Sequence, residues 1–145
     1  MNPNDNAAFW KIIDTAATAG PLSGTRQRAI AAALETATAV ELDAFNVTLW
    51  GWFSALGLPE LRVAAERLMG ECSEGAFNDF RCWLILQGQE KVERVVSTPD
   101  VLGTWRYDET PRTQGLLTIG LRIRTTNFGP PNWESDPFGP RESRP

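Results

Sequence analysis

The sequence predicts an all-α protein: a bundle of about six short helices followed by an irregular C-terminal tail rich in Pro and Gly. Up to residue 105, apolar residues recur every three or four positions, which is the period of a helix with one buried face. Beyond residue 105, six of the ten prolines occur, while Ala and Lys are absent. A chain of 145 residues suits one domain with one core. We therefore expect a helical domain over residues 1–105 and an irregular or disordered tail over residues 106–145.

The first two helices are bounded by residues that cap or break helices. Asn4 or Asp5 can cap the first helix, because either side chain can accept a hydrogen bond from an unpaired backbone N–H. The Gly20-Pro21 pair ends this helix. The second helix is expected over residues 25–36, with a thin buried face in which alanine is frequent.

The third helix has the clearest start signal. Thr38 followed three residues later by Glu41 is a capping-box pattern, in which each side chain bonds the other residue's backbone N–H. Gly57 ends the helix. Its apolar residues step by three and four, which predicts the central helix of the core. These residues are Leu42, Phe45, Leu49, Trp52, Phe53 and Leu56.

Three shorter helices follow. Pro59 suits the first position of a helix, so a fourth helix is expected from there to Gly70. Ser73 is the natural cap of a fifth helix over residues 74–87. A sixth helix is expected over residues 89–97.

The tail contains one segment with a regular pattern. The run LLTIGLRIRT, residues 116–125, alternates enough to predict a short strand or hairpin arm. From Thr126 onward the chain is rich in Pro, Gly and Asn, which predicts irregular or disordered structure.

The charge distribution narrows the range of partners. The net charge is −4 and the pI about 4.9, and residues 1–105 carry 13 acidic groups against 8 basic ones. Nucleic acids and anionic membranes attract basic surfaces, so we expect neither as a partner. A protein partner, basic in character, fits better. The chain has no apolar run of membrane-spanning length and no signal-peptide pattern, so we expect a cytoplasmic protein.

The chain contains no histidine and only two cysteines, Cys72 and Cys82. Without histidine there is no Ser-His-Asp or Cys-His catalysis within the chain, and no zinc site of the usual kind. Two cysteines are too few for a disulfide scaffold. We expect no catalytic residue, no metal and no cofactor.

Arg81 lies in the most apolar run of the chain, FNDFRCWLILQGQE, residues 77–90. On a helical wheel it falls on the same face as Phe77, Phe80, Leu84 and Ile85. A guanidinium removed from water must be hydrogen-bonded, so we expect a carboxylate partner or an anionic ligand. The candidate partners are Glu71, Glu74, Asp43 and Asp100.

Three further residues are candidates for binding. Cys72 precedes a helix N-terminus, where the helix dipole can lower a thiol pKa, although nearby carboxylates such as Glu74 oppose this effect. Trp50 and Trp52 point about 200° apart on a helix, so one core cannot hold both. Either Trp50 contacts solvent or a partner, or the helix is buried on both sides.

The fifth-helix region resembles a bacterial family known as domain of unknown function 4240. The resemblance spans residues 7–103 and depends on the order FR-x-WLI-x-QG around Arg81, with Cys72-Ser73 before it and Pro99-Asp100 after it. It implies a small helical protein and no established reaction. The family usually has two acidic residues after the Cys-Ser pair, whereas this chain has Glu74 and then Gly75.

Two hypotheses of function follow. The first is a non-enzymatic protein-interaction domain, for instance an immunity or antitoxin-like inhibitor of a basic protein. The second is a small enzyme or accessory subunit that binds an anionic small molecule at Arg81, Glu74 and Cys72. The absence of histidine favours the first hypothesis.

Overall fold

The computed structural model describes residues 3–70, 72–105 and 113–131, with the side chains of residues 6–70 in the first range. These residues form seven α-helices and one 3-10 helix, and no strand occurs among them. The all-α bundle is therefore confirmed. The helices are α1 (Pro3–Ala17), α2 (Ser23–Leu34), α3 (Ala39–Ala55), α4 (Pro59–Met69), α5 (Glu74–Leu86), α6 (Gln89–Ser97), η1 (Pro99–Thr104) and α7 (Leu116–Phe128).

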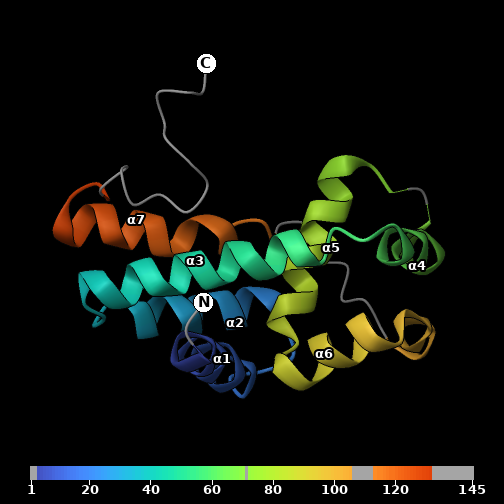
Figure 1. Cartoon of the computed structure of the whole chain (residues 1–145), viewed down its shortest axis with the longest axis horizontal. Coiled ribbons are helices and arrows are strands. Elements are labelled where there is room, and N and C mark those ends of the chain that lie inside the picture. Colours follow the sequence, from blue (N-terminus) through green and yellow to red (C-terminus); the bar gives the residue numbers. More distant parts are fainter. Residues whose placement is uncertain (1–2, 71, 106–112, 132–145) are drawn as a thin grey trace.

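The helices pack around α3 and α5 (Figure 1). α3 runs along the length of the molecule, and it packs against α7, α1 and α5. α2 packs against α1 and α7, while α4 and α6 both pack against η1 at the opposite end. None of the described helices is long and apolar enough to cross a membrane.

α5 is the most deeply buried helix of the bundle. Five consecutive residues, Cys82 to Leu86, are all buried, so the last turns of α5 are surrounded by other helices. α3 presents a buried stripe, as its pattern predicts, and the sequence therefore identified one of two central helices. The buried residues of α5 are Phe77, Phe80, Cys82, Trp83, Leu84, Ile85 and Leu86.

The predicted strand or hairpin over residues 116–125 is wrong, because this segment belongs to helix α7. Leu116, Ile119 and Ile123 are buried at steps of three and four, so the same apolar residues also fit a helix. No strand is available to pair with them in the described part of the chain, whereas α3 and α2 offer an apolar surface. The core thus continues beyond residue 105. Residues 106–112 and 132–145, where the rest of the irregular tail was predicted, lie outside the described residues.

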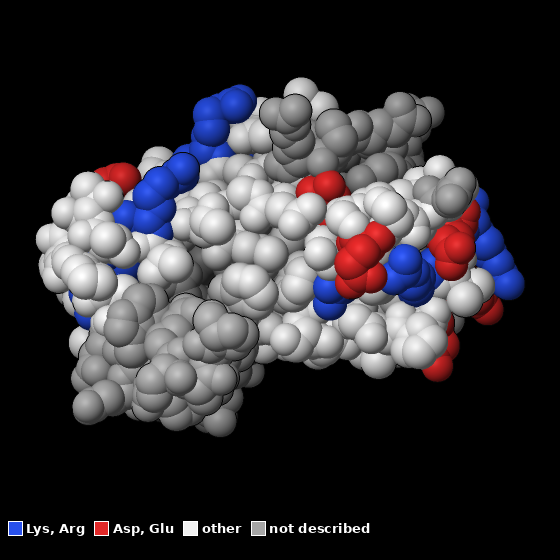
Figure 2. All heavy atoms as spheres, turned by 90° about the horizontal axis from the view of Figure 1, so that it is seen from above, with Lys and Arg blue, Asp and Glu red and all other residues white. Residues whose placement is uncertain are grey.

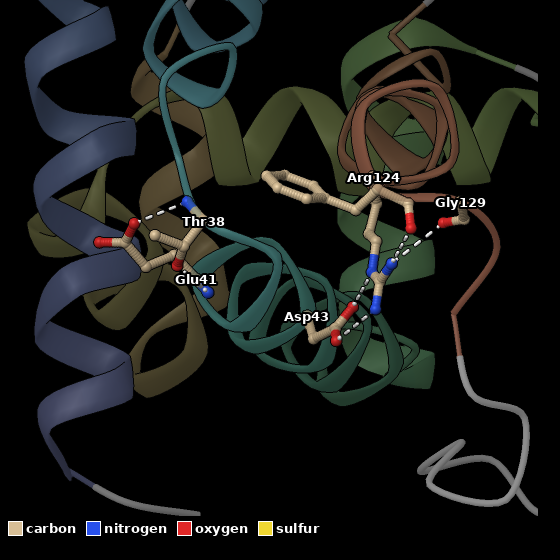
Figure 3. A network of polar contacts seen from close by, with 6 residues as sticks. Thr38, Glu41, Asp43, Arg124 and Gly129 are labelled. Atoms are coloured by element: carbon tan, nitrogen blue, oxygen red, sulfur yellow. Dashed lines mark hydrogen bonds and ion pairs between the residues drawn. The ribbon is translucent and has the colours of Figure 1, made fainter.

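Two of the local caps agree with the sequence. Thr38 Oγ1 accepts from the Glu41 N–H at 3.1 Å, and Glu41 Oε1 accepts from the Thr38 N–H at 2.8 Å (Figure 3). Hydrogen bonds that the Glu41 carboxyl accepts from the backbone and the side chain of Thr38 lower the pKa of this carboxyl. Ser73 Oγ accepts from the Ala76 N–H at 3.1 Å at the start of α5. The predicted caps at Thr38 and Ser73 are confirmed. The predicted cap at Asn4 or Asp5 is wrong, because α1 begins at Pro3 and both residues lie inside it.

At two other helix starts, the first backbone N–H groups are bound by a carboxylate from a distant helix. Asp14 of α1 accepts from the Gln89 N–H at 3.0 Å, at the start of α6. Asp79 of α5 accepts from the N–H groups of Thr113 and Gln114, both at 3.1 Å, in the turn that leads into α7. A carboxylate suits these positions because the first N–H groups of a helix have no partner within it.

An ion pair joins α7 to α3 (Figure 3). Arg124 donates from Nε to Asp43 Oδ1 at 3.0 Å and from Nη2 to Asp43 Oδ2 at 3.4 Å, so the planar guanidinium meets the carboxylate with two bonds. Nη1 also donates to the carbonyls of Phe128 and Gly129 at the end of α7. The side chain of Arg124 is only 13% exposed. The Arg124 side chain therefore holds α7 against α3 and binds two carbonyls at the end of α7.

We predict that Gly88→Ala destabilises the protein more than Gly70→Ala. Both glycines have positive φ and nearly extended ψ, a combination that costs other residues about 1–3 kcal/mol. A Cβ at Gly88 would also lie 2.7 Å from Asp14 Oδ1 and displace the cap of α6, whereas nothing lies within 4 Å of a Cβ at Gly70. Urea unfolding of both variants measures the difference. Equal losses would show that the Asp14 contact contributes nothing.

We predict that Asp79→Ala lowers the free energy of unfolding by about 1–3 kcal/mol, because it leaves two backbone N–H groups without an acceptor. Hydrogen exchange should accelerate in α7 before it does in α3. Asp100→Ala is the matched control, since Asp100 is exposed on η1. Unchanged protection of α7 in Asp79→Ala would contradict this role.

Candidate functional site

Arg81 extends from α5 to the C-terminal end of α3. Its Nη1 donates to the Phe53 carbonyl at 3.0 Å, and its Nη2 donates to Oδ1 of Asn78, three residues earlier on α5. The guanidinium carbon lies 3.8 Å from the centre of the Phe53 ring. The last carbonyls of a helix carry partial negative charge, so the end of α3 offers Arg81 electrostatic compensation.

The expected carboxylate partner of Arg81 is absent among the described candidates. Glu74 pairs with Arg62 at 2.9 Å, and Asp43 pairs with Arg124. Asp100 is exposed and forms no ion pair with a described residue. That expectation is therefore wrong for these three residues, because a carbonyl, an amide and aromatic rings occupy the surroundings of Arg81. Glu71 lies outside the described residues.

The charge of Arg81 remains incompletely compensated. Removal from water lowers the pKa of its guanidinium, and the nearby charge of Arg62 acts in the same direction, while Cys82 and Glu74 oppose the change. An arginine still keeps its proton at neutral pH. Its Nε is buried without a hydrogen-bond acceptor in the described structure. The Arg81 guanidinium therefore has more N–H donors than the described residues supply with acceptors.

Arg62 of α4 brings the other candidates next to Arg81. It donates from Nη1 to Glu74 Oε2 and from Nη2 to the Cys72 carbonyl, both at 2.9 Å. Its guanidinium carbon lies 5.4 Å from the centre of the Phe77 ring, and that of Arg81 lies 5.0 Å from the same ring. Two cationic side chains from different helices thus share one aromatic residue of α5, with cation–π attraction to its ring.

Trp50 joins this group through Phe53. The two rings on α3 lie 5.4 Å apart in an edge-to-face arrangement. Trp52 instead contacts Trp10 of α1 at 5.2 Å, and both Trp50 and Trp52 are partly buried. α3 is therefore covered on two sides, as one of the two sequence interpretations requires. We call the series Trp50, Phe53, Arg81, Phe77 and Arg62 the cation–aromatic stack.

The structure thus places all four predicted site residues in one region. Arg81 and Trp50 belong to the stack, while Glu74 and Cys72 are bonded to its last member, Arg62. Sequence reasoning missed Arg62, because its distance along the chain from Arg81 gives no sign of proximity. The contact between Arg81 and Asn78 could have been predicted from the sequence, since residues three apart on a helix are neighbours.

Both thiols are buried and have raised pKa values. Burial raises the pKa of Cys72, with Glu66 and Glu74 adding to the rise and Arg62 opposing it. Burial and the charge of Asp79 raise the pKa of Cys82 to about 12, with Arg81 opposing the rise. Each thiol therefore stays protonated at neutral pH, which disfavours nucleophilic reactivity at Cys72. Within the described ranges, no group of His, Cys, Asp and Glu side chains could hold a metal ion.

The chain matches the family described as Protein of unknown function (DUF4240) over residues 5–122. The chain belongs to the DUF4240 family. The match extends beyond the resemblance over residues 7–103 in both directions, and it reaches from α1 into α7. The DUF4240 match thus includes the first half of the helix that the sequence predicted to be a strand or hairpin. No curated protein and no solved structure matches the chain.

We predict that Cys82 makes the stability fall as the pH rises from about 9 towards 12. The folded thiol holds its proton after the unfolded thiol, with its ordinary pKa of 9.0, has lost it. Its contribution is therefore fully present below pH 9 and is lost as the pH approaches the folded pKa. Urea unfolding at several pH values should give a shallower decline for Cys82→Ala than for the wild type. Parallel declines would contradict this linkage.

Proposed function

We propose that this chain is a non-enzymatic protein-interaction domain that binds a basic protein, in the manner of an immunity or antitoxin-like inhibitor. The proposal is supported by exposed carboxylates around two exposed valines at the end of the molecule formed by α4, η1 and α6. Val63 of α4 is 48% exposed and Val96 of α6 is 39% exposed. Each has a glutamate three residues before it, on the same helical face. We call Glu60, Val63, Glu66, Glu93, Val96 and Asp100 the acidic end.

The carboxylates of the acidic end keep their charge available. Arg62 and Arg94, which lie on α4 and α6, pair with Glu74 and Glu90. The four carboxylates of the acidic end form no ion pair with any described residue. Arg67 and Lys91, two cations of the same helices, likewise form no ion pair with a described residue. Four unpaired carboxylates against two unpaired cations leave the excess charge of this end negative.

The distribution of charged side chains over the surface favours the approach of a basic partner to the acidic end. Figure 2 shows acidic side chains together with basic ones over the end where α4 lies, and a row of mainly basic side chains towards the other end. A basic partner would be steered to the acidic end and repelled from the other. The valines would supply the apolar contact that holds the complex after encounter.

The groups that an enzyme would use are engaged in holding the fold. Arg81 bonds the end of α3, Glu74 pairs with Arg62, and the Cys72 thiol is buried with a raised pKa. These contacts favour the interaction hypothesis over a catalytic function for the same residues.

The test compares three forms of the full chain: wild type, Glu66→Lys combined with Glu93→Lys, and Glu35→Lys. Each form is immobilised and exposed to extract of its native host at low and high salt. We expect the wild type and Glu35→Lys to retain the same basic protein at a ratio of about 1:1, and the double variant to lose it. The reason is that complementary charges at the rim of an interface speed association, and the double variant reverses two of them. The purified partner should lose its own activity when the wild-type chain is added.

Glu35 is the matched control because it is exposed at the end of α2, outside the acidic end. An acidic partner, or equal retention by all three forms, would overturn the proposed surface. Retention of a small molecule without any stoichiometric protein would overturn the proposed function itself.

A further inference from the structure

Gly57 leaves the approach to Arg81 uncovered. It lies in the turn between α3 and α4 and is exposed. Its φ is outside the left-handed region, so the backbone at this position does not need glycine. A Cβ there would lie 3.0 Å from Nη1 of Arg81, a tight contact that would press on the guanidinium. Glycine therefore leaves the guanidinium, on a residue of intermediate burial, without a covering side chain at position 57.

The guanidinium beneath Gly57 has unused donors and an uncompensated charge. Arg81 has five N–H donors, of which Nη1 and Nη2 each use one on Phe53 and Asn78. No described carboxylate pairs with it. The second cation of the stack, Arg62, has a side chain that is 37% exposed, and it adds positive charge beside the same Phe77 ring. Glu74 offsets one of the two charges, which leaves the pair with a net positive charge.

We propose that the surface over Gly57 and Arg81 binds a small oxyanion, a carboxylate or a phosphate, through the remaining N–H groups of Nη1 and Nη2 of Arg81, since Nε is buried. A guanidinium presents parallel donors that match two oxygens of either group. Asn78 and the Phe53 carbonyl hold the guanidinium in place, so little ordering accompanies binding. Arg62 attracts the anion over a longer distance. The site uses none of the residues of the acidic end, whose carboxylates would repel an anion.

The test titrates the full chain with inorganic phosphate and, separately, with succinate, at constant ionic strength in chloride buffer. Binding is followed by NMR shifts of the Gly57 amide and the Arg81 Nε–H group, and by calorimetry. We expect saturable binding of at least one anion with shifts at both positions. Tighter binding of phosphate or of succinate identifies which oxyanion the site favours.

Two variants with matched controls decide whether the site is the one proposed. Arg81→Lys should weaken binding about tenfold or more, because an ammonium cannot form the paired bonds. Gly57→Ala should weaken it several-fold, because its Cβ would lie 3.0 Å from Nη1 and cover the guanidinium. The controls, Arg28→Lys on α2 and Gly103→Ala on η1, should leave binding unchanged, since a Cβ at Gly103 meets nothing within 4 Å.

Circular dichroism establishes that each variant is folded. If Arg81→Lys unfolds, Gly57→Ala decides alone. The proposal is overturned if neither anion binds saturably, if the shifts occur away from Gly57 and Arg81, or if a control variant loses as much affinity as Gly57→Ala.

Discussion

The backbone groups at helix ends are the constraint on which this bundle depends. Each short helix has four N–H groups and four carbonyls without an internal partner, so a bundle of short helices has many ends for its size. Charged side chains from other helices bind several of them. Asp14 bonds the start of α6, Asp79 the turn into α7, Arg26 the Leu86 carbonyl and Arg81 the Phe53 carbonyl. The charges that fix the ends of helices thus also fix how the helices pack.

This constraint explains why an arginine lies on the apolar face of α5. A neutral side chain could fill the space, but a guanidinium can bond the end of α3 and stack on Phe53 and Phe77 at the same time. Cation–π contacts contribute most where water is excluded, about 2 kcal/mol or more. A carboxylate partner is not required, because the end of a helix supplies partial negative charge. The incomplete compensation that results is what makes Arg81 suited to an external anion.

The charged residues described by the structure include some that bond one helix to another and some that are exposed without an ion pair. Arg124 and Asp43, on α7 and α3, bond one another, and the Arg124 side chain is largely buried. Glu60, Glu66 and Asp100 are exposed at the other end without an ion pair among the described residues. Neutralising these exposed carboxylates would change the free energy of unfolding little. Selection for stability alone therefore does not explain their charge. The proposed surface for a basic protein would account for both the charge and the exposed valines of the acidic end.

Local signals in the sequence determined the six helices up to residue 97, because caps and periodicity act within a few residues. The capping box of Thr38 and Glu41, the Ser73 cap and the bounds of α6 all follow from neighbouring positions. The wheel also placed Arg81 correctly on the buried face of α5. It could not identify the contacts of Arg81, since Phe53 comes from another helix and Arg62 from a third. Tertiary structure alone decided that residues 116–125 are helical, because their apolar spacing fits either a strand or a helix, and the surface of α3 with the Asp79 cap selects the helix.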